Sequence, residues 1–390
     1  MSRIAITALA VSLLSTPWAR AQQPTVAALA GQPAVKAALA AVRAGEPRTI
    51  EDQIRFCEVP APPFREKARG EVLRGAFVDA GLLNVRVDRV GNVLGDWPGA
   101  AARPRLVVAA HLDTVFPEGT DVRVTRDGAI LRGPGIGDDC RGLAELVAVA
   151  RAIRDARIRT PGSITFVANV GEEGLGDLSG MKALFGETMK NQIDRFVSID
   201  GGGLNIMAIG VGSRRYRVTF KGPGGHSFAA FGLANPANAL GRAIAKIAEI
   251  RVPDKPSTTF NVGRVGGGAA VNAIPSEAWM EVDLRSTDAG QLSALEARVL
   301  AAVEAAVVEE NQRWGTPRVV TVVKEIVGDR PAGATSERSP IVQTAMAVAQ
   351  VLGLYAPMAE GSGDPNLPMS LGIPAIGIGF GGRDLDAHAP

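Results

Sequence analysis

The chain has 390 residues, of which 46% are hydrophobic and 21% charged, with 46 glycines and 25 prolines. At about 150 residues per domain, this length predicts two or three domains. The composition excludes collagen, long disorder and a small disulfide-rich scaffold. The formal net charge of +2 argues against a nucleic-acid-binding protein, because such proteins present a strongly basic surface.

The first 21 residues have the pattern of a secretion signal. Arg3 gives a positive start, Ile4–Ser15 is mostly apolar, and Ala19-Arg20-Ala21 matches a cleavage site. The alternative interpretation is a short buried helix. The apolar stretch is too short to span a membrane comfortably, and no later run is long and apolar enough. We therefore expect an exported protein, periplasmic or secreted, that starts at Gln22 and has no net charge once both arginines of the signal are lost.

The chain contains two cysteines, Cys57 and Cys140. Export would permit a disulfide, because disulfides persist in oxidising compartments. Sequence alone does not show whether the two Cα atoms lie close enough for the bond. We expect two buried free thiols, and the disulfide stays open as the alternative.

The first 100 residues read as helices followed by strands. Predicted helices cover residues 22–47, Thr49–Cys57 and Arg65–Ala80, and predicted strands cover Asn84–Asp88 and Val93–Asp96. Pro60-Ala61-Pro62-Pro63 must end the second helix, and Gly81 ends the third.

Four later segments are apolar without polar alternation, as in strands that are buried on both faces of a sheet. They are Leu106–Ala110, Ser163–Val170, Arg195–Ile199 and Ala375–Phe380. Helical stretches lie between them, notably Gly142–Ile158 and Pro340–Leu352. This alternation predicts an α/β fold, a sheet with helices on both sides.

Residues 211–327 follow a different order. The predicted elements are strand Tyr216–Phe220, helix Pro236–Ile250, strands Thr258–Val265 and Glu277–Arg285, helix Ala289–Trp314 and strand Arg318–Ile326. This is the β-α-β-β-α-β order of a ferredoxin-like α+β domain. We therefore predict an inserted domain over 211–327, between the two parts of the α/β domain at 22–210 and 328–390.

Polar side chains gather where the buried runs end. They are His111, Asp113 and Thr114 after the first run, Glu172 and Glu173 after the second, Asp200 after the third, and Asp384, Asp386 and His388 after the fourth. The loop Gly133–Asp139 adds Asp138 and Asp139. Because the carboxyl ends of strands line the binding crevice of an open α/β sheet, we expect these groups to converge.

Converging carboxylates repel one another, and a bound cation relieves the repulsion. Two histidines with three or four carboxylates suit Zn²⁺ and are compatible with Co²⁺ or Mn²⁺. Two bridged metals would activate a water and polarise a carbonyl, while a spare carboxylate acts as general base. Of Glu172 and Glu173, we expect one to bind metal and the other to move the proton.

The histidines strengthen this interpretation, because the chain has only three: His111, His226 and His388. A single histidine is more often structural than a ligand. These three, however, all occupy strand ends or glycine-rich segments; His226 lies in Gly-Pro-Gly-Gly-His-Ser.

At these positions the chain resembles the dinuclear zinc peptidases and deacylases that include glutamate carboxypeptidase, peptidase T, aminoacylase and succinyl-diaminopimelate desuccinylase. The matching motifs are His111-Leu-Asp113-Thr114, Gly135-Ile-Gly-Asp138-Asp139, Gly171-Glu172-Glu173-Gly174, Ser198-Ile-Asp200, Gly-Pro-Gly-Gly-His226-Ser227, Asn272-Ala-Ile-Pro275, Asp283-Leu-Arg285 and Ala387-His388. The resemblance implies a zinc-exopeptidase-like mixed sheet flanked by helices, with an inserted dimerisation lid.

The resemblance also implies roles for matching residues. Asp138 would bridge two metals, with His111 and Asp200 completing one site and Glu173 and His388 the other. Glu172 would be the general base. Asp113 would hold the His111 imidazole, and the bond between Asp138 and Asp139 would be cis.

In the lid, the resemblance implies that His226 reaches the active site of a partner subunit and stabilises the oxyanion. Asn272 and Arg285 resemble lid residues that hold a substrate carboxylate. A surface ion pair is the alternative role for Arg285.

Three features depart from the family pattern. Relatives often have Asp-Asp-Lys-Gly or Asp-Met-Lys-Gly here, whereas this chain has Asp-Asp-Cys-Arg-Gly over residues 138–142. The Cys140 thiol beside the metals could therefore be an adventitious ligand or an oxidation site. The loop Glu360–Asn366 only approximates the family's substrate loop, although backbone N–H groups near Gly361 and Ser362 could bind a carboxylate. The sequence ends two residues after His388, so we expect either a truncated sequence or a frayed end with a weakened His388 site.

We therefore predict a hydrolase with two divalent metals that cleaves amide bonds of small substrates through a metal-bound hydroxide and Glu172. An exopeptidase acting on short peptides is the first hypothesis, as a homodimer without nucleic acid or membrane span. An N-acyl-amino-acid deacylase or desuccinylase is the second, and a non-catalytic metal-dependent binding protein the third. A nucleotide-binding protein is disfavoured, because the glycines at 133–137 run into two aspartates that would repel phosphate.

Overall fold

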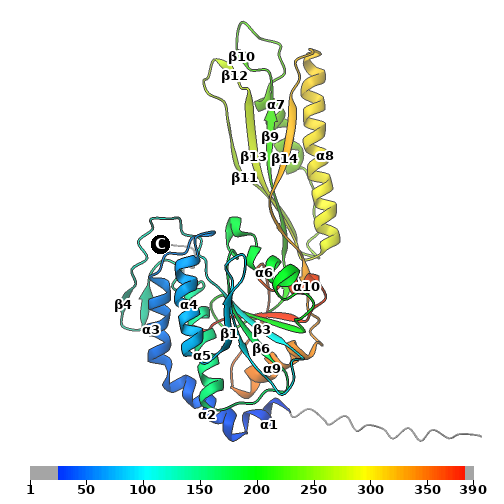
Figure 1. Ribbon diagram of the computed structural model, residues 1–390. Helices are drawn as coiled ribbons and strands as arrows, with labels where there is room; N and C mark the ends of the chain where they lie inside the picture. Colours follow the sequence, from blue (N-terminus) through cyan, green and yellow to red (C-terminus); the bar gives the residue numbers. More distant parts are fainter. Residues whose placement is uncertain (1–24, 383–390) are drawn as a thin grey trace, which may run out of the picture.

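The computed structural model describes residues 25–382. The predicted signal segment and the predicted site residues Asp384, Asp386 and His388 lie outside this range. The described chain forms two parts, a broad sheet flanked by helices and an elongated second part that projects from it (Figure 1). Between residues 25 and 382, no helix is long and apolar enough to cross a membrane.

The broad sheet has nine strands within the described range, ordered β1-β2-β6-β3-β7-β17-β8-β15, with β16 also pairing with β8. Their bounds are β1 Leu83–Val87, β2 Val93–Trp97, β3 Leu106–His111, β6 Ile164–Asn169, β7 Arg195–Ile199, β8 Ile206–Gly210, β15 Gly333–Ala334, β16 Met358–Gly361 and β17 Ala375–Ile378. The mixed α/β sheet predicted from the apolar runs is confirmed.

The middle of this sheet is parallel. Strand β3 pairs in parallel with β6 and β7, and β17 pairs in parallel with β7, whereas β1, β2 and β8 pair with their neighbours in the sheet order in antiparallel fashion. The four parallel strands are the four predicted apolar runs. Their carboxyl ends therefore meet at one edge, which brings together the polar residues that follow them.

Helices cover both faces of this sheet. Successive residues of a strand point to opposite faces, so each strand contributes apolar side chains to both helical layers. On β3, Val108 and Ala110 face a cluster with α3 (Glu46–Cys57), α4 (Lys67–Asp79) and α5 (Cys140–Asp155). Val107 and Ala109 face a cluster with α6 (Ser179–Ala183) and the helical turn η2 (Leu184–Thr188). The remaining elements of this part are α1 (Val26–Ala30), α2 (Pro33–Ala44), η1 (Gly174–Gly176), α9 (Pro340–Val351), α10 (Asn366–Ser370) and the hairpin β4 (Thr125–Asp127) and β5 (Ile130–Arg132).

We call the projecting part, residues 212–330, the lid. It contains β9 (Gly212–Lys221), α7 (Pro236–Ala248), β11 (Thr258–Gly267), β13 (Glu277–Ser286), α8 (Ala289–Trp314) and β14 (Thr321–Arg330). The antiparallel strand order β11-β13-β9-β14 is that of a ferredoxin-like sheet. Alternate strand residues such as Val218 and Leu284 pack with Val299 of α8 into a separate core.

The structure shifts one strand and adds short ones. The last lid strand is Thr321–Arg330 rather than Arg318–Ile326, because the Asn311 side chain binds both backbone groups of Val320 and keeps them out of the strand ladder. The sequence pattern missed β8, β15 and β16, which are short and contain glycine or alternate little. It also missed β10 (Gly225–His226), which pairs with β12 (Ala273–Ile274) near the outer end of the lid (Figure 1).

Candidate metal centre

His111 ends β3 and lies at the centre of the acidic group. Its Nε2 atom is 2.9 Å from Asp138 Oδ1 and 3.9 Å from Asp200 Oδ1. One ligand atom from each of the three residues lies within 4.8 Å of the other two. The imidazole itself is buried. These are the three residues to which the family resemblance gives one metal site.

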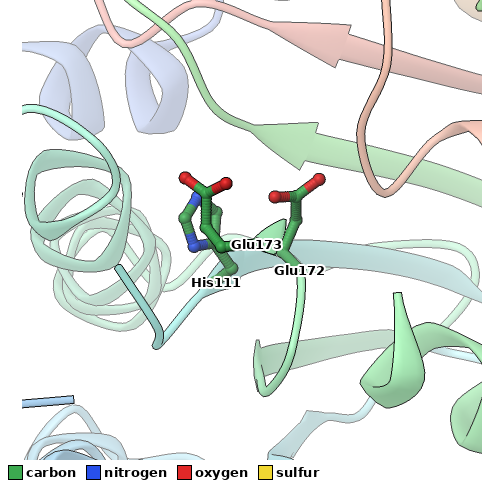
Figure 2. A group of neighbouring side chains, drawn as sticks. All are labelled: His111, Glu172 and Glu173. Carbon is green, nitrogen blue, oxygen red and sulfur yellow. The ribbon is translucent and has the colours of Figure 1, made fainter. Parts of the chain in front are cut away.

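Glu172 and Glu173 follow β6 and complete a second group. Together with His111, they place ligand atoms within 4.8 Å of one another, and all three side chains are buried. Figure 2 shows both carboxylates pointing to the side on which the imidazole lies. A nitrogen and four carboxylates from His111, Asp138, Glu172, Glu173 and Asp200 are thus brought to one place.

Asp113 contacts both His111 and the backbone of the glutamate pair. The His111 Nδ1 atom is 3.0 Å from the Asp113 carbonyl oxygen and 3.6 Å from its carboxylate. That carboxylate also accepts hydrogen bonds from the backbone amides of Glu172, at 3.0 Å, and Glu173, at 2.8 Å. Asp113 therefore contacts the His111 imidazole and also fixes the backbone of the glutamate pair.

Asp138 and Asp139 are joined by a cis peptide bond, as expected. The buried Asp139 carboxylate accepts hydrogen bonds from the amide of His111, at 2.9 Å, and from that of Gly142, at 3.1 Å, in the first turn of α5. Asp139 is therefore used by the scaffold, whereas Asp138 reaches the imidazole.

Several acidic groups are buried close together here, and their pKa values are shifted as a result. Burial raises the pKa of Glu172 well above its usual range despite the opposing effect of Arg330, and burial raises that of Asp200 to about 6. Burial alone would lower the pKa of His111, but Asp113 and Asp138 raise it well above its usual range. The site thus holds protons that a cation would displace.

The donor set fits divalent cations. One imidazole nitrogen and several carboxylate oxygens are a set that suits Zn²⁺ and is compatible with Co²⁺ or Mn²⁺. The separation of 2.9 Å between Nε2 of His111 and Asp138 Oδ1 allows both to bind one ion. Within residues 25–382, the centre has this single histidine; the predicted second one, His388, lies outside the described residues.

Two residues near the centre were missed from the sequence. Arg330, at the end of β14, donates from Nη1 to Glu172 Oε1 at 2.9 Å and from Nη2 to the Glu172 carbonyl. Asp364 is fully buried and accepts a 2.8 Å hydrogen bond from Asn169, and burial raises its pKa to about 7. Arg330 is the last residue of β14 and Asp364 follows β16, and no local sequence pattern distinguished either of them as part of the site.

The predicted substrate loop passes directly beside the centre. A Cβ atom added to Gly363 would lie 3.5 Å from Asp200 Oδ2 and 3.6 Å from Glu172 Oε1. The carbonyl of Ser362 accepts a 3.3 Å hydrogen bond from Arg330, and Gly361 ends β16. The loop that contains Gly361 and Ser362 is therefore adjacent to the acidic group.

The predicted lid residues lie in two separate places within one chain. His226 lies on β10 and Asn272 just before β12, near the outer end of the lid (Figure 1). Arg285 is near the other end of β13, where it forms a 2.7 Å ion pair with Asp283. Most of β13 (Glu277–Ser286) therefore lies between Asn272 and Arg285 in one chain.

A link runs from Arg285 to the acidic centre. Asp283 also pairs with Arg215 at 3.2 Å, and Arg215 donates to the Gly174 carbonyl at 3.3 Å, one residue after Glu173. The ion pair considered as the alternative for Arg285 thus exists, and it lies on the inner end of the lid.

Comparison with known proteins identifies the family. The model of peptidase family M20/M25/M40 matches residues 107–390, which include every metal-centre residue above. The chain belongs to this family. Its activity is therefore that of a hydrolase of peptide or related amide bonds.

Similar proteins span most of the chain. The uncharacterized protein YqjE of Bacillus subtilis is 24% identical over 359 residues, covering 86% of this chain and 91% of YqjE. The aminopeptidase PepT of Bacillus cereus has a TM-score of 0.70 at 22% identity, covering 87% of this chain and 91% of PepT. The YXEP protein of Bacillus subtilis, a dinuclear metal-binding M20 peptidase, has a TM-score of 0.64 at 16% identity, covering 89% and 93%. These likenesses establish the shared fold.

Proposed function

We propose that this M20 hydrolase is an exopeptidase that cleaves short peptides with two Zn²⁺ ions. The observation that carries the proposal is the buried Glu172 beside the ligand group of His111, Asp138 and Asp200, held by Arg330. A carboxylate in that place can move a proton without leaving the metal centre.

The residues that would hold the metals are His111 and Asp200 for one ion and Glu173 with His388 for the other, with Asp138 shared. When bound, the ions supply Lewis-acid polarisation of the scissile carbonyl and lower the pKa of water. Asp113 contributes by fixing His111 and the amides of the glutamate pair in place.

Glu172 is the proposed general base. Arg330 occupies its Oε1 atom, which leaves Oε2 to take the proton of the attacking water and then deliver it to the leaving amine. Because Arg330 is itself buried and charged, it favours the ionised form of Glu172 that the first step needs. Arg330 thus positions the base and opposes the effect of its burial.

We further propose a homodimer in which His226 and Asn272 act on the site of the partner subunit. Both lie near the outer end of the lid, away from their own centre (Figure 1). Phe228 and Phe231, beside His226, are 87% and 79% exposed. Apolar side chains exposed to this degree favour burial against another protein surface.

The substrate carboxylate would bind between the chain's own Arg285 and Asn272 of the partner subunit. Arg285 lies on the lid end that is linked through Arg215 to Gly174. A guanidinium can bind a carboxylate through two parallel hydrogen bonds. Backbone N–H groups of the loop at Gly361 and Ser362 would contact the other end of a short substrate. We also propose that the protein is exported.

The test uses the chain produced from Gln22 and loaded with Zn²⁺ or Co²⁺. It is incubated with free di- and tripeptides together with N-acetyl and N-succinyl amino acids, and mass spectrometry identifies the products. Glu172→Gln protein and chelated protein are the controls. We expect peptides to be consumed only by the metal-loaded wild type.

Consumption of the acyl amino acids instead would replace the exopeptidase proposal with a deacylase. Absence of any cleavage by protein with two bound metals would favour a metal-dependent binding protein. Cleavage that persists in the Glu172→Gln variant would contradict the role of Glu172.

A further inference from the structure

The two cysteines of the chain meet in the core next to the metal centre. Cys57 is the last residue of α3 and Cys140 the first of α5, and these helices pack together. Both thiols are free and buried, as expected, and both cysteines border the loop before Asp138: the Cys57 thiol donates to the Pro134 carbonyl, and the Cys140 amide donates to the Gly135 carbonyl, each at 3.3 Å. Cys140 follows the Asp138–Asp139 pair directly, so the two cysteines lie immediately behind the proposed bridging ligand.

Helix α3 already holds the loop that carries Asp138. The Gln53 side chain donates a 2.7 Å hydrogen bond to the carbonyl of Ile136, and the Cys57 thiol donates to the carbonyl of Pro134 at 3.3 Å. The buried Arg69 donates to the carbonyls of both Cys57 and Leu112, the residue after His111. The cysteine pair is therefore part of the support of two metal-ligand segments.

We propose that Cys57 and Cys140 form a disulfide when the protein folds in an oxidising compartment, fastening α3 to the Asp138 loop. The oxidant is a second disulfide, either a small-molecule disulfide or that of a thiol oxidase. One cysteine thiolate attacks it and releases a thiol, and the other cysteine then attacks the mixed disulfide and releases the second thiol. The pair loses two electrons and two protons, and the oxidant gains them.

Burial predicts how this bond behaves. Neither sulfur is accessible in the folded protein, so the bond should form during folding and then resist reductants until the protein unfolds. The bond closes a loop of roughly 80 residues, and a loop of this length strongly restricts the unfolded chain. Oxidised protein should therefore melt at a higher temperature than reduced protein, by at least about 5 °C.

The test begins with reduced protein that is unfolded and refolded in a glutathione redox buffer or in dithiothreitol. Each sample is denatured, alkylated, digested and analysed by mass spectrometry. We expect one peptide pair joined through Cys57 and Cys140 in the glutathione sample, and its higher melting temperature. Two fully alkylated cysteines, separate glutathione adducts, or equal melting temperatures would overturn the proposal.

A second sample avoids refolding. Protein exported to a bacterial periplasm is purified natively and mapped in the same way; we expect the same linked pair, and free thiols there would contradict it. In Cys57→Ala and Cys140→Ala proteins, the difference in melting temperature between the two buffers should disappear. None of these readouts depends on peptide cleavage, so they separate this inference from the proposed function.

The consequence for Asp138 rests on the proposed metal centre and has its own readout. Release of Zn²⁺ to a colorimetric chelator should be slower from oxidised than from reduced wild type. Equal release rates, with the linked pair present, would show that the bond stabilises the fold without supporting the metal centre.

Discussion

The edge of the central sheet and the lid assemble their functional residues in different ways. At the sheet edge, His111, Glu172, Glu173 and Asp200 follow three neighbouring parallel strands and converge within one chain. In the lid, His226 and Asn272 lie near one end of the long sheet, and Arg285 lies near the other end. The parallel strands thus bring His111 and the four carboxylates together within one chain, whereas the proposed lid residues would form one site only if a second copy supplied part of it.

The two regions also touch. The last lid strand, β14, ends in Arg330, which binds Glu172, and the preceding amide of Asp329 donates to the carboxylate of Asp177 at 2.9 Å and 3.0 Å. Asp177 lies four residues after Glu173. The end of β14 thus contacts Glu172 directly and also contacts Asp177, which follows the glutamate pair in the chain.

The largest expected effect belongs to the sheet edge. Glu172→Gln keeps an oxygen for Arg330 but removes the base, so we expect kcat to fall by about 10³-fold with metal content unchanged. Steady-state kinetics and elemental analysis measure both quantities. Loss of metal from this variant would mean that Glu172 is a ligand and would reverse the assignment of Glu172 and Glu173.

The next effect belongs to the lid. His226→Ala should lower kcat by about 10²-fold, because it removes one donor to the oxyanion, and should leave both metals bound. Ser227→Ala is the matched control, because it keeps the backbone amide of Ser227, which donates to the Asn272 carbonyl at 2.9 Å. Equal activity of His226→Ala and wild type would confine catalysis to the sheet edge.

Low pH should weaken the binding of metal ions at the sheet edge. In the metal-free protein, burial raises the pKa of Asp200 to about 6, so this carboxyl carries a proton below that pH. A metal must displace that proton, and apparent affinity should therefore fall about tenfold per pH unit below pH 6 for each displaced proton. Competition with a chelator between pH 5 and 8 measures this; affinity that is constant or rises toward acid would contradict it.

The smallest effect concerns the connection between the regions. Asp177 has a left-handed backbone, with φ of 54°, which asparagine tolerates better than alanine. Asp177→Asn keeps an acceptor for Asp329 and should be nearly wild type, whereas Asp177→Ala should lower kcat by about fivefold. Lys182→Met, which removes only the 2.6 Å ion pair with Asp177, is the control. Equal kinetics of all three would show that the connection does not affect the glutamate pair.

The sheet edge was also the more predictable region. The apolar runs identified the four parallel strands, and the polar residues at their ends include those that the structure brings within 4.8 Å of one another. Arg330 and Asp364 escaped because they act through burial and through contacts with distant segments, which no local pattern records.

In the lid, the sequence predicted the elements and their order. The β-α-β-β-α-β pattern was correct, and α8 was predicted as Ala289–Trp314. The predicted strand Glu277–Arg285 already lies between Asn272 and Arg285, and it matches β13 to within one residue. An extended strand spans about 3.3 Å per residue, so the separation follows from that strand, whereas the two short motifs taken alone do not record it.

The most direct test of this comparison is a heterodimer of two inactive variants. Glu172→Gln and His226→Ala chains carry different affinity tags, are co-produced, and the heterodimer is purified through both tags. Action across the dimer predicts one complete site, with Glu172 of one chain and His226 of the other, and therefore about half the wild-type turnover per dimer. A heterodimer no more active than its two parent homodimers would contradict a site completed by a second copy.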